Sequence, residues 1–336
     1  MPRAKIAGIG MNVPDQIVTN EDLSKLMDTN DEWIRTRTGI ERRRFATEGM
    51  STSGLAVPAA EQAIEDAGLT KKDIGLILFA TLSPDHHFPG SGCYMQAAMG
   101  MEGVGVMDIR NQCSGFLYGL GTAVAFVESG AYEHVLVVGS EIHSAGLDLT
   151  TKGRDVAVLF GDGAGAAVIS RSAEDDPATI HSFHLYADGR YADALAQKIW
   201  DIREHPFIQH DGKAGVVNPE LLYAKMNGRE VFKYATRGMV GAIMEACTRN
   251  GVTIDDIDLV VPHQANMRIN EYVAKMLEIA PEKVIHSIVD YGNTTAATIP
   301  MAMCVAREQG RLEKGMKVMC VGFGSGFTWG SAFLTY

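Results

Sequence analysis

Residues 61–80 read EQAIEDAGLTKKDIGLILFA, and residues 244–263 read MEACTRNGVTIDDIDLVVPH. Each stretch has the pattern of a helix end, a glycine that stops the helix, an acidic turn and a strand of apolar residues. Strands that are apolar on both faces are typical of α/β proteins, where helices cover both sides of a sheet. The recurrence of the pattern predicts two similar halves.

The correspondence continues downstream of both stretches. NQCSGFLYGLGTAVAF (111–126) and NTTAATIPMAMCVARE (293–308) each place a polar turn before an apolar helix, and each is followed by an apolar strand. The polar stretch SAEDDPA (172–178) separates the two series, so we expect an N-terminal half at 1–173 and a C-terminal half at 174–336. Weak self-similarity also arises by chance between α/β segments of common type, and that alternative stays open. Either way the fold class is layered α/β.

Composition and charge exclude several classes of protein. The chain has 336 residues, 46% of them hydrophobic, and no apolar run of the roughly 18 to 20 residues that span a bilayer. Its first residues lack the apolar core of a signal peptide, so we expect a cytoplasmic protein with no membrane insertion. A net charge of −11 argues against a nucleic-acid partner, because phosphate binding relies on clustered Lys and Arg.

The cysteines and histidines do not predict a metal site or a disulfide framework. The cysteine number is odd and there is no Cys-x-x-Cys pair. Asp85-His86-His87 are adjacent on an expected loop, which is poor geometry for tetrahedral coordination.

Glycine-rich stretches at 161–165 and 322–326 lack the strand, Gly-x-Gly-x-x-Gly, helix order of a nucleotide site. The segment Asp188 to Pro219, with Trp200 and Phe207, has no sustained period and is expected to be a surface flap or cleft-lining loop.

Cys113 is the first candidate catalytic residue. VGVMDIR (104–110) is expected to be a buried strand and SGFLYGLGTAVAFVESG (114–130) a helix, so Cys113 falls at a strand-to-helix turn. A helix N-terminus favours negative charge, so we expect the thiol pKa to lie below its free value of about 8.5. A buried cysteine is otherwise a small apolar residue, which is our interpretation of Cys93, Cys247 and Cys304.

His263 and Asn293 are the second and third candidates. His263 directly follows the apolar strand 257–261, at the end where a parallel sheet presents its ligands. Asn293 follows Gly292 in a turn before an apolar helix. Each alone also fits a structural role, a packed histidine or an Asx turn. Together, a neutral imidazole and a side-chain amide can supply two hydrogen-bond donors to one developing oxyanion.

Five motifs carry a family resemblance: DEWIRTRTGIERR, NQCSGFLYG, HQANMRI, YGNTTAATIP and GFGSGFTWGSA, in this order along the chain. They resemble the β-ketoacyl-acyl carrier protein synthase III group of the thiolase superfamily, over almost the whole chain. The resemblance implies a five-layered αβαβα fold from two duplicated halves, and a homodimer. It also implies that Cys113 accepts an acyl group from coenzyme A, and that malonyl-acyl carrier protein then decarboxylates and attacks the acyl thioester.

The resemblance also implies roles for individual residues. His263 and Asn293 would stabilise the enolate, and the backbone N–H groups of Cys113 and Ser325 would form the oxyanion hole for the thioester. No permanently bound cofactor is implied, because the coenzyme A thioester is a substrate. Positions that match coenzyme A contacts in the family are Trp33, Arg37, Arg154, Phe232 and Asn266. Phe88 resembles the residue that reaches across the dimer to close the partner's acyl pocket.

A basic stripe is the candidate landing site for the carrier protein. Lys225, Arg229, Lys233 and Arg237 recur every four residues, so a helix would put the last three on one face. Phe232, Ala235, Met239 and Ile243 would then form the apolar face. Arg268 and Lys275 extend the stripe. The alternative is an ordinary solvated helix face.

The substrate and two rival functions stay open. The long 188–219 segment, together with TLSPDHH and DIRNQCSGFLYGL, resembles alkylquinolone-forming relatives as much as fatty-acid initiators. Cys320, just before Gly322, resembles the second catalytic cysteine of thiolases, although the stretch at 292–296 lacks the histidine of that family. A non-catalytic acyl-binding subunit is the alternative from another class of protein. An intact Cys113, His263 and Asn293 speak against it.

Overall fold

Two stacked sheets organise the computed structural model, which describes residues 3–199 and 219–336. Among these residues, the first sheet has the strand order β1 (Arg3–Asn12), β7 (Gly163–Ser172), β6 (His134–Glu141), β4 (Leu76–Ala80) and β5 (Gly105–Ile109). The second has the order β11 (Leu259–Pro262), β12 (Lys317–Gly324), β13 (Thr328–Thr335) and β8 (Thr179–Ala187). In each sheet a parallel part, β5–β4–β6 or β11–β12, continues into antiparallel strands.

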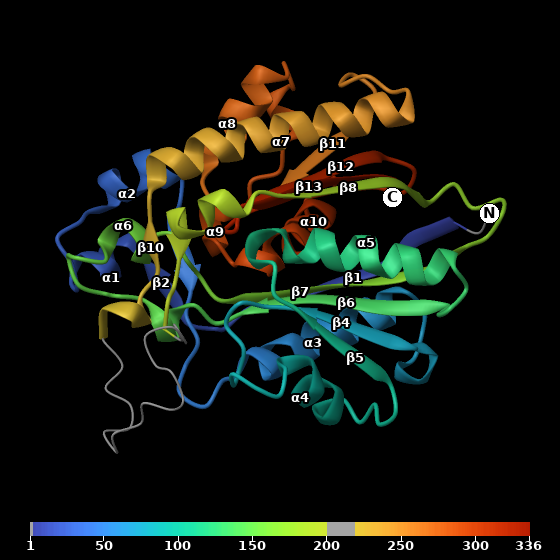
Figure 1. Ribbon diagram of the computed structural model, residues 1–336, viewed down its shortest axis with the longest axis horizontal. Helices are drawn as coiled ribbons and strands as arrows, with labels where there is room; N and C mark the ends of the chain where they lie inside the picture. The colour runs from blue at the N-terminus through green and yellow to red at the C-terminus, as the bar shows by residue number, and fades with distance from the viewer. Residues whose placement is uncertain (1–2, 200–218) are drawn as a thin grey trace.

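Helices separate and cover the sheets, as Figure 1 shows. Helices α5 (Gly115–Glu128) and α10 (Thr298–Glu308) lie between the two sheets. Helices α3 (Thr52–Asp66) and α4 (Ser91–Ala98) cover the outer face of the first sheet, and α7 (Gly228–Asn250) and α8 (Met267–Met276) cover that of the second. The layers are therefore α, β, α, β, α, which confirms the predicted fold class.

Shorter elements gather at one end of the layers, on the left in Figure 1. They are the helices α1 (Asn20–Ser24), α2 (Asp31–Thr38), α6 (Arg154–Ala157) and α9 (Ile288–Tyr291), and the strand pairs β2 (Ile17–Thr19) with β3 (Arg42–Arg44) and β9 (Leu195–Ala196) with β10 (Lys225–Met226). Of the expected loop at 188–219, residues 189–194 form a 3-10 helix before β9, while Trp200 and Phe207 lie outside the described residues.

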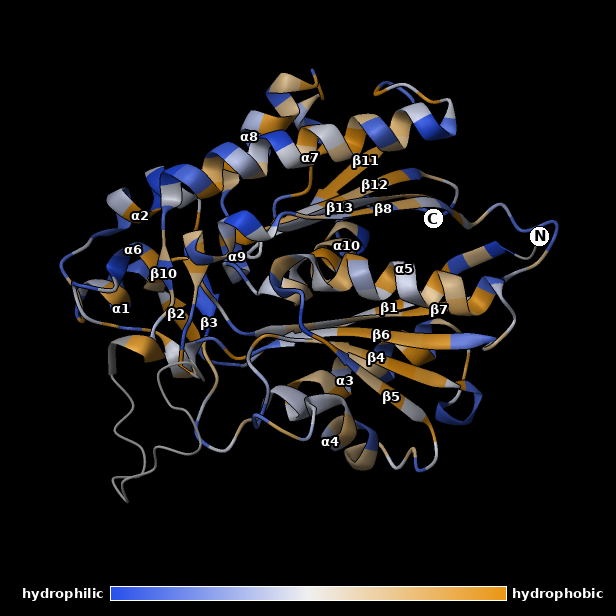
Figure 2. Ribbon diagram, viewed as in Figure 1, coloured by the Kyte–Doolittle hydropathy of each residue, from blue (hydrophilic) through white to orange (hydrophobic). Residues whose placement is uncertain are grey.

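The repeated stretches fold in the predicted way. Helix α3 is followed by Gly68 with φ 69°, and α7 by Gly251 with φ 63°, a left-handed conformation that glycine adopts without steric cost. The strands β4 and β11 then begin, and both are buried along their whole length. Apolar colour runs along the strands of the first sheet in Figure 2, whereas α7 alternates between polar and apolar residues. This is the pattern of a helix with one side on a core.

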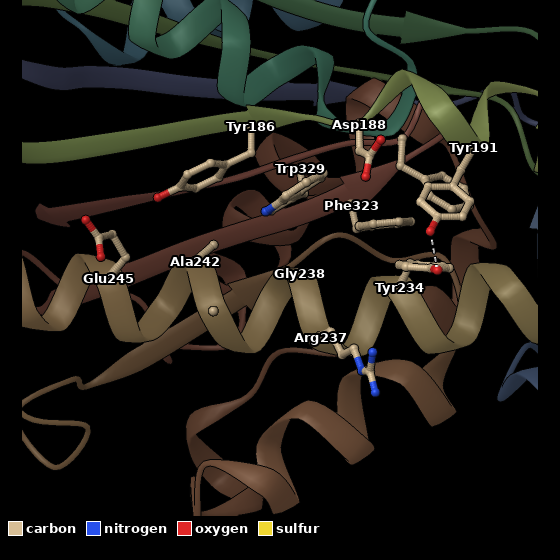
Figure 3. Close-up of a pocket in the computed structure, with 12 residues that line it drawn as sticks. Tyr186, Asp188, Tyr191, Tyr234, Arg237, Gly238, Ala242, Glu245, Phe323 and Trp329 are labelled. Carbon is tan, nitrogen blue, oxygen red and sulfur yellow. Dashed lines mark hydrogen bonds between the residues drawn. The ribbon is translucent and has the colours of Figure 1, made fainter.

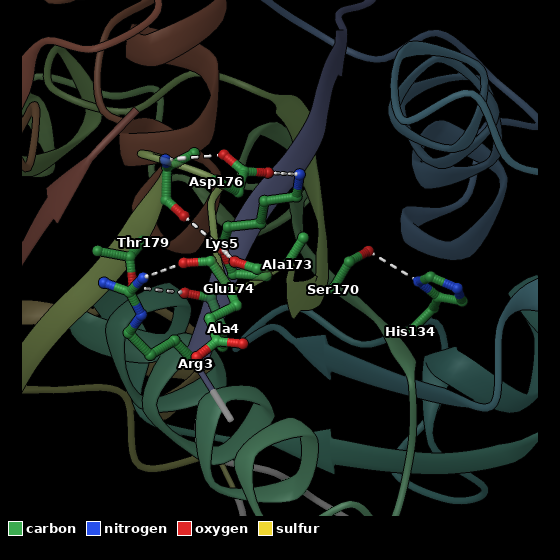
Figure 4. Close-up of polar contacts among 11 residues, drawn as sticks. Arg3, Ala4, Lys5, His134, Ser170, Ala173, Glu174, Asp176 and Thr179 are labelled. Atoms are coloured by element: carbon green, nitrogen blue, oxygen red, sulfur yellow. Dashed lines mark hydrogen bonds and ion pairs between the residues drawn. The ribbon is translucent and has the colours of Figure 1, made fainter. Parts of the chain in front are cut away.

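A short connection between β7 and β8 carries the chain from the first sheet to the second (Figure 4). Lys5 of β1 pairs with Asp176 in this connection, and the Asp176 carboxylate also accepts from the backbone N–H of Ala178 at 2.9 Å. At the far side of β7, His134 Nδ1 lies 2.8 Å from Ser170 Oγ. The expected boundary at 173/174 falls in this connection, and the duplication of the two halves stays a prediction.

Two expectations about burial are wrong. Strand β5 was expected to be buried, but it lies at the edge of the first sheet with β4 as its one hydrogen-bonded neighbour, and Met107 at its centre is 45% exposed. Cys93 was expected to be a buried apolar residue, but it lies on the exposed side of α4. Cys247 and Cys304 are buried as expected, and Cys320 is buried as well. No helix in the described ranges has the length and apolar character needed to cross a membrane.

Candidate active site

A cavity of about 140 Å³ brings the three predicted catalytic residues together. Cys113 comes from the 3-10 turn at 112–114 before α5, His263 directly follows β11, and Asn293 lies in the turn after α9. Phe232 of α7 and Asn266 at the start of α8 also line the cavity. The rest of the wall is mainly apolar, with Phe160, Met239 and Phe323 among its members. An enclosed apolar wall around a few polar groups is typical of an enzyme site.

Cys113 is buried, and its backbone is packed closely against β12. A Cβ atom on Gly324 would lie 2.8 Å from the Cys113 Cβ, so only glycine fits at 324. Burial raises the pKa of the Cys113 thiol to about 12, and the Glu141 carboxylate adds to this rise. The backbone N–H groups of Ser325 and of Cys113 itself act in the opposite direction. The expected lowering of the thiol pKa is therefore wrong, because desolvation of the thiolate outweighs the donors around it.

His263 is a neutral imidazole with one nitrogen held and the other without a partner. Its Nδ1 lies 2.6 Å from Thr298 Oγ1, while Nε2 is buried and has no hydrogen-bond partner in the described ranges. Burial lowers the pKa of His263 to about 3. The ring therefore stays uncharged at neutral pH, and the residue lines the cavity that also contains Cys113 and Asn293.

Asn293 forms the Asx turn that its position suggested, and this turn uses only one end of its amide. The backbone N–H of Thr295 donates to Asn293 Oδ1 at 2.9 Å, and the Asn293 N–H donates to the Leu159 carbonyl at 2.8 Å. The preceding Gly292 has φ 64°. Within residues 3–199 and 219–336 no acceptor binds Asn293 Nδ2. The amide nitrogen is therefore available as a donor in the cavity.

A basic, aromatic surface lies on the short elements beside the cavity. The Arg37 guanidinium is 4.5 Å and that of Arg154 5.0 Å from the centre of the Trp33 ring. The Asn266 side chain donates through Nδ2 to the Arg37 carbonyl at 3.1 Å, so this surface is directly connected to a residue of the cavity wall. A flat ring beside two guanidinium groups can bind a base by stacking and phosphates by charge.

The remaining predicted residues lie outside the cavity. Phe88 is 80% exposed in the loop after β4 and does not line the cavity of its own chain. Arg229, Lys233 and Arg237 are exposed along α7, as the four-residue spacing predicted, and Arg268 is exposed on α8. In the described ranges, no group of three His, Cys, Asp or Glu side chains is arranged to hold a metal ion.

A larger groove of about 390 Å³ lies on the other side of Phe323, between α7 and the strands β8 and β13 (Figure 3). Tyr186 and Trp329 stack in it at 5.6 Å, and Gly238 and Ala242 leave its helix side open. Arg237 is the one predicted site residue on its wall. It contains neither Cys113 nor His263 nor Asn293, so the smaller cavity is the candidate active site.

Sequence reasoning missed the residues that hold the candidate catalytic groups. His143, Thr295 and Thr298 are buried and hydrogen-bonded around Asn293 and His263. Glu141 is buried behind the site, where it accepts from Ser83 and from the backbone N–H of Leu82, and burial raises its pKa to about 7. The sequence did contain one signal for them. Glu141 and His143 come at the carboxyl end of the apolar strand at 134–141, and His263 was identified by the same position after its own strand.

Comparison with known proteins gives one consistent result. The family model described as 3-oxoacyl-[acyl-carrier-protein] synthase III matches residues 107–189, and its C-terminal counterpart matches residues 247–336. A beta-ketoacyl-[acyl-carrier-protein] synthase III of Bacillus anthracis is 43% identical over 331 residues, 98% of each chain, and one of Clostridium perfringens is 41% identical over 334 residues, 99% of each.

Solved structures are similar over the same length. The 3-oxoacyl-[acyl-carrier-protein] synthase III of Aquifex aeolicus has a TM-score of 0.90 at 39% identity, with 99% of this chain and 100% of that chain covered. The priming beta-ketosynthase of the R1128 polyketide pathway has a TM-score of 0.89 at 31% identity, with 99% and 96% covered. The similarity therefore extends over both sheets and all three helical layers.

Proposed function

Because the chain belongs to the 3-oxoacyl-[acyl-carrier-protein] synthase III family and is therefore a condensing acyltransferase, we propose that Cys113, His263 and Asn293 carry out its reaction. Cys113 takes an acyl group from acyl-coenzyme A. Malonyl-acyl carrier protein then loses CO₂ and attacks this acyl group to give 3-oxoacyl-acyl carrier protein. The observation that carries the proposal is the meeting, in one apolar cavity, of a thiol, an amide donor and an imidazole nitrogen that has no partner among the described residues.

The acylation half-reaction begins with a protonated thiol. The bond from Cys113 Sγ to the acyl carbon forms, the bond from that carbon to the coenzyme A sulfur breaks, and the thiol proton leaves with the coenzyme A thiolate. The neutral His263 can accept this proton at Nε2 and return it. The backbone N–H groups of Cys113 and Ser325, which already act on the sulfur, stabilise the tetrahedral intermediate.

The condensation half-reaction needs donors instead of a base. As the malonyl carboxylate leaves as CO₂, its bonding electrons form an enolate, whose oxygen accepts hydrogen bonds from Asn293 Nδ2 and His263 Nε2–H. The enolate carbon then forms a bond to the acyl carbon, and Cys113 leaves as the thiolate, which takes up one proton from water to restore the thiol. The Thr298 hydroxyl has one proton, so its direction sets the tautomer of His263. When it donates to the Thr295 carbonyl, it accepts from Nδ1–H and Nε2 is the base; when it turns to donate to Nδ1, Nε2 carries the hydrogen and is the donor.

The binding of both substrates is part of the proposal. The Trp33, Arg37 and Arg154 surface would hold the nucleotide end of coenzyme A, and the pantetheine arm would run past Asn266 and Phe232 to Cys113. The exposed stripe Arg229, Lys233 and Arg237 with Arg268 would receive the acidic carrier protein. All five cysteines are free, which supports a reducing, cytoplasmic location.

A homodimer completes the proposal. Strand β5 leaves one edge of the first sheet without a neighbouring strand in the described chain, and exposed edges of this kind pair or are covered in native proteins. Phe88 is 80% exposed in the connection between β4 and α4, so it is available to close the acyl pocket of a second copy. The acyl pocket would then be incomplete in the monomer.

The test is acylation followed by discharge. Purified protein is incubated with a panel of acyl-coenzyme A thioesters that vary in length and branching, and its intact mass is measured. Malonyl-acyl carrier protein, or malonyl-coenzyme A in a parallel arm, is then added. We expect one acyl mass on Cys113 and its release as a 3-oxoacyl product. A protein that gains no acyl mass, or gains one that malonyl donors do not remove, contradicts the proposal and favours an acyl-binding subunit.

A further inference from the structure

Thr295, two residues after Asn293 and behind the cavity wall, has an unusual backbone conformation. Its φ is 50°, in the left-handed region that a β-branched residue rarely adopts, and it is fully buried. A conformation of this kind persists only where the surroundings hold it, and it clusters at functional sites. Contacts around Thr295 must therefore hold this conformation.

The backbone of Thr295 is linked to both proposed donors of the condensation step. Its N–H donates to Asn293 Oδ1 at 2.9 Å, which leaves Asn293 Nδ2 available in the cavity. Its carbonyl accepts from Thr298 Oγ1 at 2.9 Å, and the same Thr298 oxygen lies 2.6 Å from His263 Nδ1. The orientation of the amide and that of the imidazole therefore both depend on the peptide groups of one residue.

His143 holds the side chain of Thr295 from the opposite half of the molecule. His143 Nε2 and Thr295 Oγ1 are 2.5 Å apart. The His143 ring packs on Phe160 at 4.6 Å, and its backbone N–H donates to Asp162 Oδ1 at 2.7 Å. Burial lowers the pKa of His143 to about 3, so it is a neutral hydrogen-bonding partner. His143 does not itself line the cavity; it contacts two residues next to the donors, Thr295 and the wall residue Phe160.

We propose that His143 is a positioning residue that holds Thr295 in its left-handed conformation and thereby aims Asn293 and His263 at the enolate. This rests on the proposed function, because it assigns a support to the two donors of that reaction. A direct proton-transfer role for His143, or simple packing against Phe160, are the alternatives.

The decisive experiment uses glycine at position 295. Glycine adopts φ near 50° without an anchor, and it keeps the N–H that binds Asn293 and the carbonyl that binds Thr298. We expect His143→Leu to slow malonyl-acyl carrier protein decarboxylation by roughly tenfold or more, the scale of a misaligned oxyanion donor. Thr295→Gly alone should decarboxylate at close to the wild-type rate, and the double variant His143→Leu with Thr295→Gly should recover to that same rate.

Two further variants distinguish a loss of positioning from a folding defect. Thr295→Val removes the same hydrogen bond with His143 intact, so it should give the same loss, and no additional loss when it is combined with His143→Leu. His134→Leu is the matched control, because it makes the same change at the first residue of β6, away from the cavity, and its decarboxylation rate should equal that of the wild type. Thermal unfolding is recorded for every variant.

The outcomes separate the alternatives. A double variant that is as slow as His143→Leu overturns the proposal, since a proton-transfer or packing role of His143 would not be rescued at position 295. An unchanged rate in His143→Leu overturns it as well. Failure of the proposed function is distinct from both, because it would show as absent acylation or decarboxylation in the wild type.

Discussion

Desolvation sets the charge of the two reactive side chains at the centre of the site. Burial raises the pKa of Cys113 to about 12 and lowers that of His263 to about 3, so both groups are neutral at pH 7. A neutral imidazole can act first as a base and then as a donor, which a permanent imidazolium could not do. The neutral thiol becomes a nucleophile only as its proton leaves during attack.

The first prediction concerns the nucleophile. Cys113→Ala should abolish acyl transfer, because no other group in the cavity can form the thioester. Cys320→Ala is the matched control, because Cys320 is fully buried in β12 and does not line the cavity. Intact mass after incubation with acyl-coenzyme A checks both. Acyl mass on Cys113→Ala protein would refute the assignment of Cys113 as the nucleophile. A comparable loss of acyl transfer in Cys320→Ala would favour a thiolase-type function.

The second prediction separates the half-reactions. Asn293→Ala removes one donor to the enolate and leaves the thiol in place, so acylation of Cys113 should continue while decarboxylation falls by roughly 100-fold. Acylation is measured by mass and decarboxylation by release of CO₂ from malonyl-acyl carrier protein. Lost acylation with intact decarboxylation would reverse the roles.

The third prediction concerns pH. His263 has a pKa of about 3 in the folded protein against an ordinary value of 6.5, so between these values the unfolded chain binds the extra proton and the free energy of unfolding falls as the pH falls. From pH 7 to pH 5 the wild type should lose about 2 kcal/mol relative to His263→Asn, at 1.36 kcal/mol per pKa unit.

Denaturant unfolding at several pH values checks this difference. Glu141 and His143, which also have shifted pKa values, are present in both proteins, so their contributions cancel in the comparison. Equal slopes for the two proteins would mean that His263 titrates normally in the folded state.

At the scale of single elements, helix α7 has a buried face and an exposed face with different roles. Its buried face, which includes Ala235, Met239 and Ile243, packs on the second sheet, and its exposed face carries Arg229, Lys233 and Arg237. The chain as a whole has a net charge of −11, whereas this stripe is positively charged. Electrostatic docking on such a stripe speeds association and is screened by salt.

The fourth prediction tests this stripe. Lys233→Glu should raise the KM for malonyl-acyl carrier protein several-fold at low salt, and Lys233→Glu with Arg237→Glu should raise it further. Acylation by acyl-coenzyme A should not change. Arg249→Glu is the control, because it makes the same charge change near the other end of α7, where Arg249 pairs with Glu245 at 2.7 Å. If Arg249→Glu has the same effect as Lys233→Glu, net charge and not the stripe is responsible.

At the scale of the whole molecule, the two sheets meet through α5 and α10, and the first sheet ends at the exposed edge of β5. The chain passes from β5, whose outer edge has no neighbouring strand within the described residues, directly into the turn that carries Cys113 before α5. Pairing of two such edges would join two molecules and bring the Phe88 loop of one towards the site of the other.

The fifth prediction tests the dimer. We expect twice the 36.3 kDa chain mass in solution, and we expect Met107→Glu to shift the protein to the monomer with loss of most condensing activity, because Phe88 no longer reaches a partner. Met244→Glu is the matched control, since Met244 is 46% exposed against 45% for Met107 but lies on α7. Light scattering and activity are measured together. A wild-type monomer with full activity would contradict the dimer.

The sequence alone determined the order of helices and strands in the repeated stretches and the places of Cys113, His263 and Asn293 in the turns beside them. These follow from local patterns: apolar strands, glycines at helix ends, and polar residues where a strand stops. Only the tertiary structure decided the exposure of β5 and Cys93, because burial depends on which segments pack side by side. It also decided the raised pKa of Cys113 and the contact of His143 with Thr295, since desolvation and hydrogen bonds between distant segments arise only once both sheets have packed.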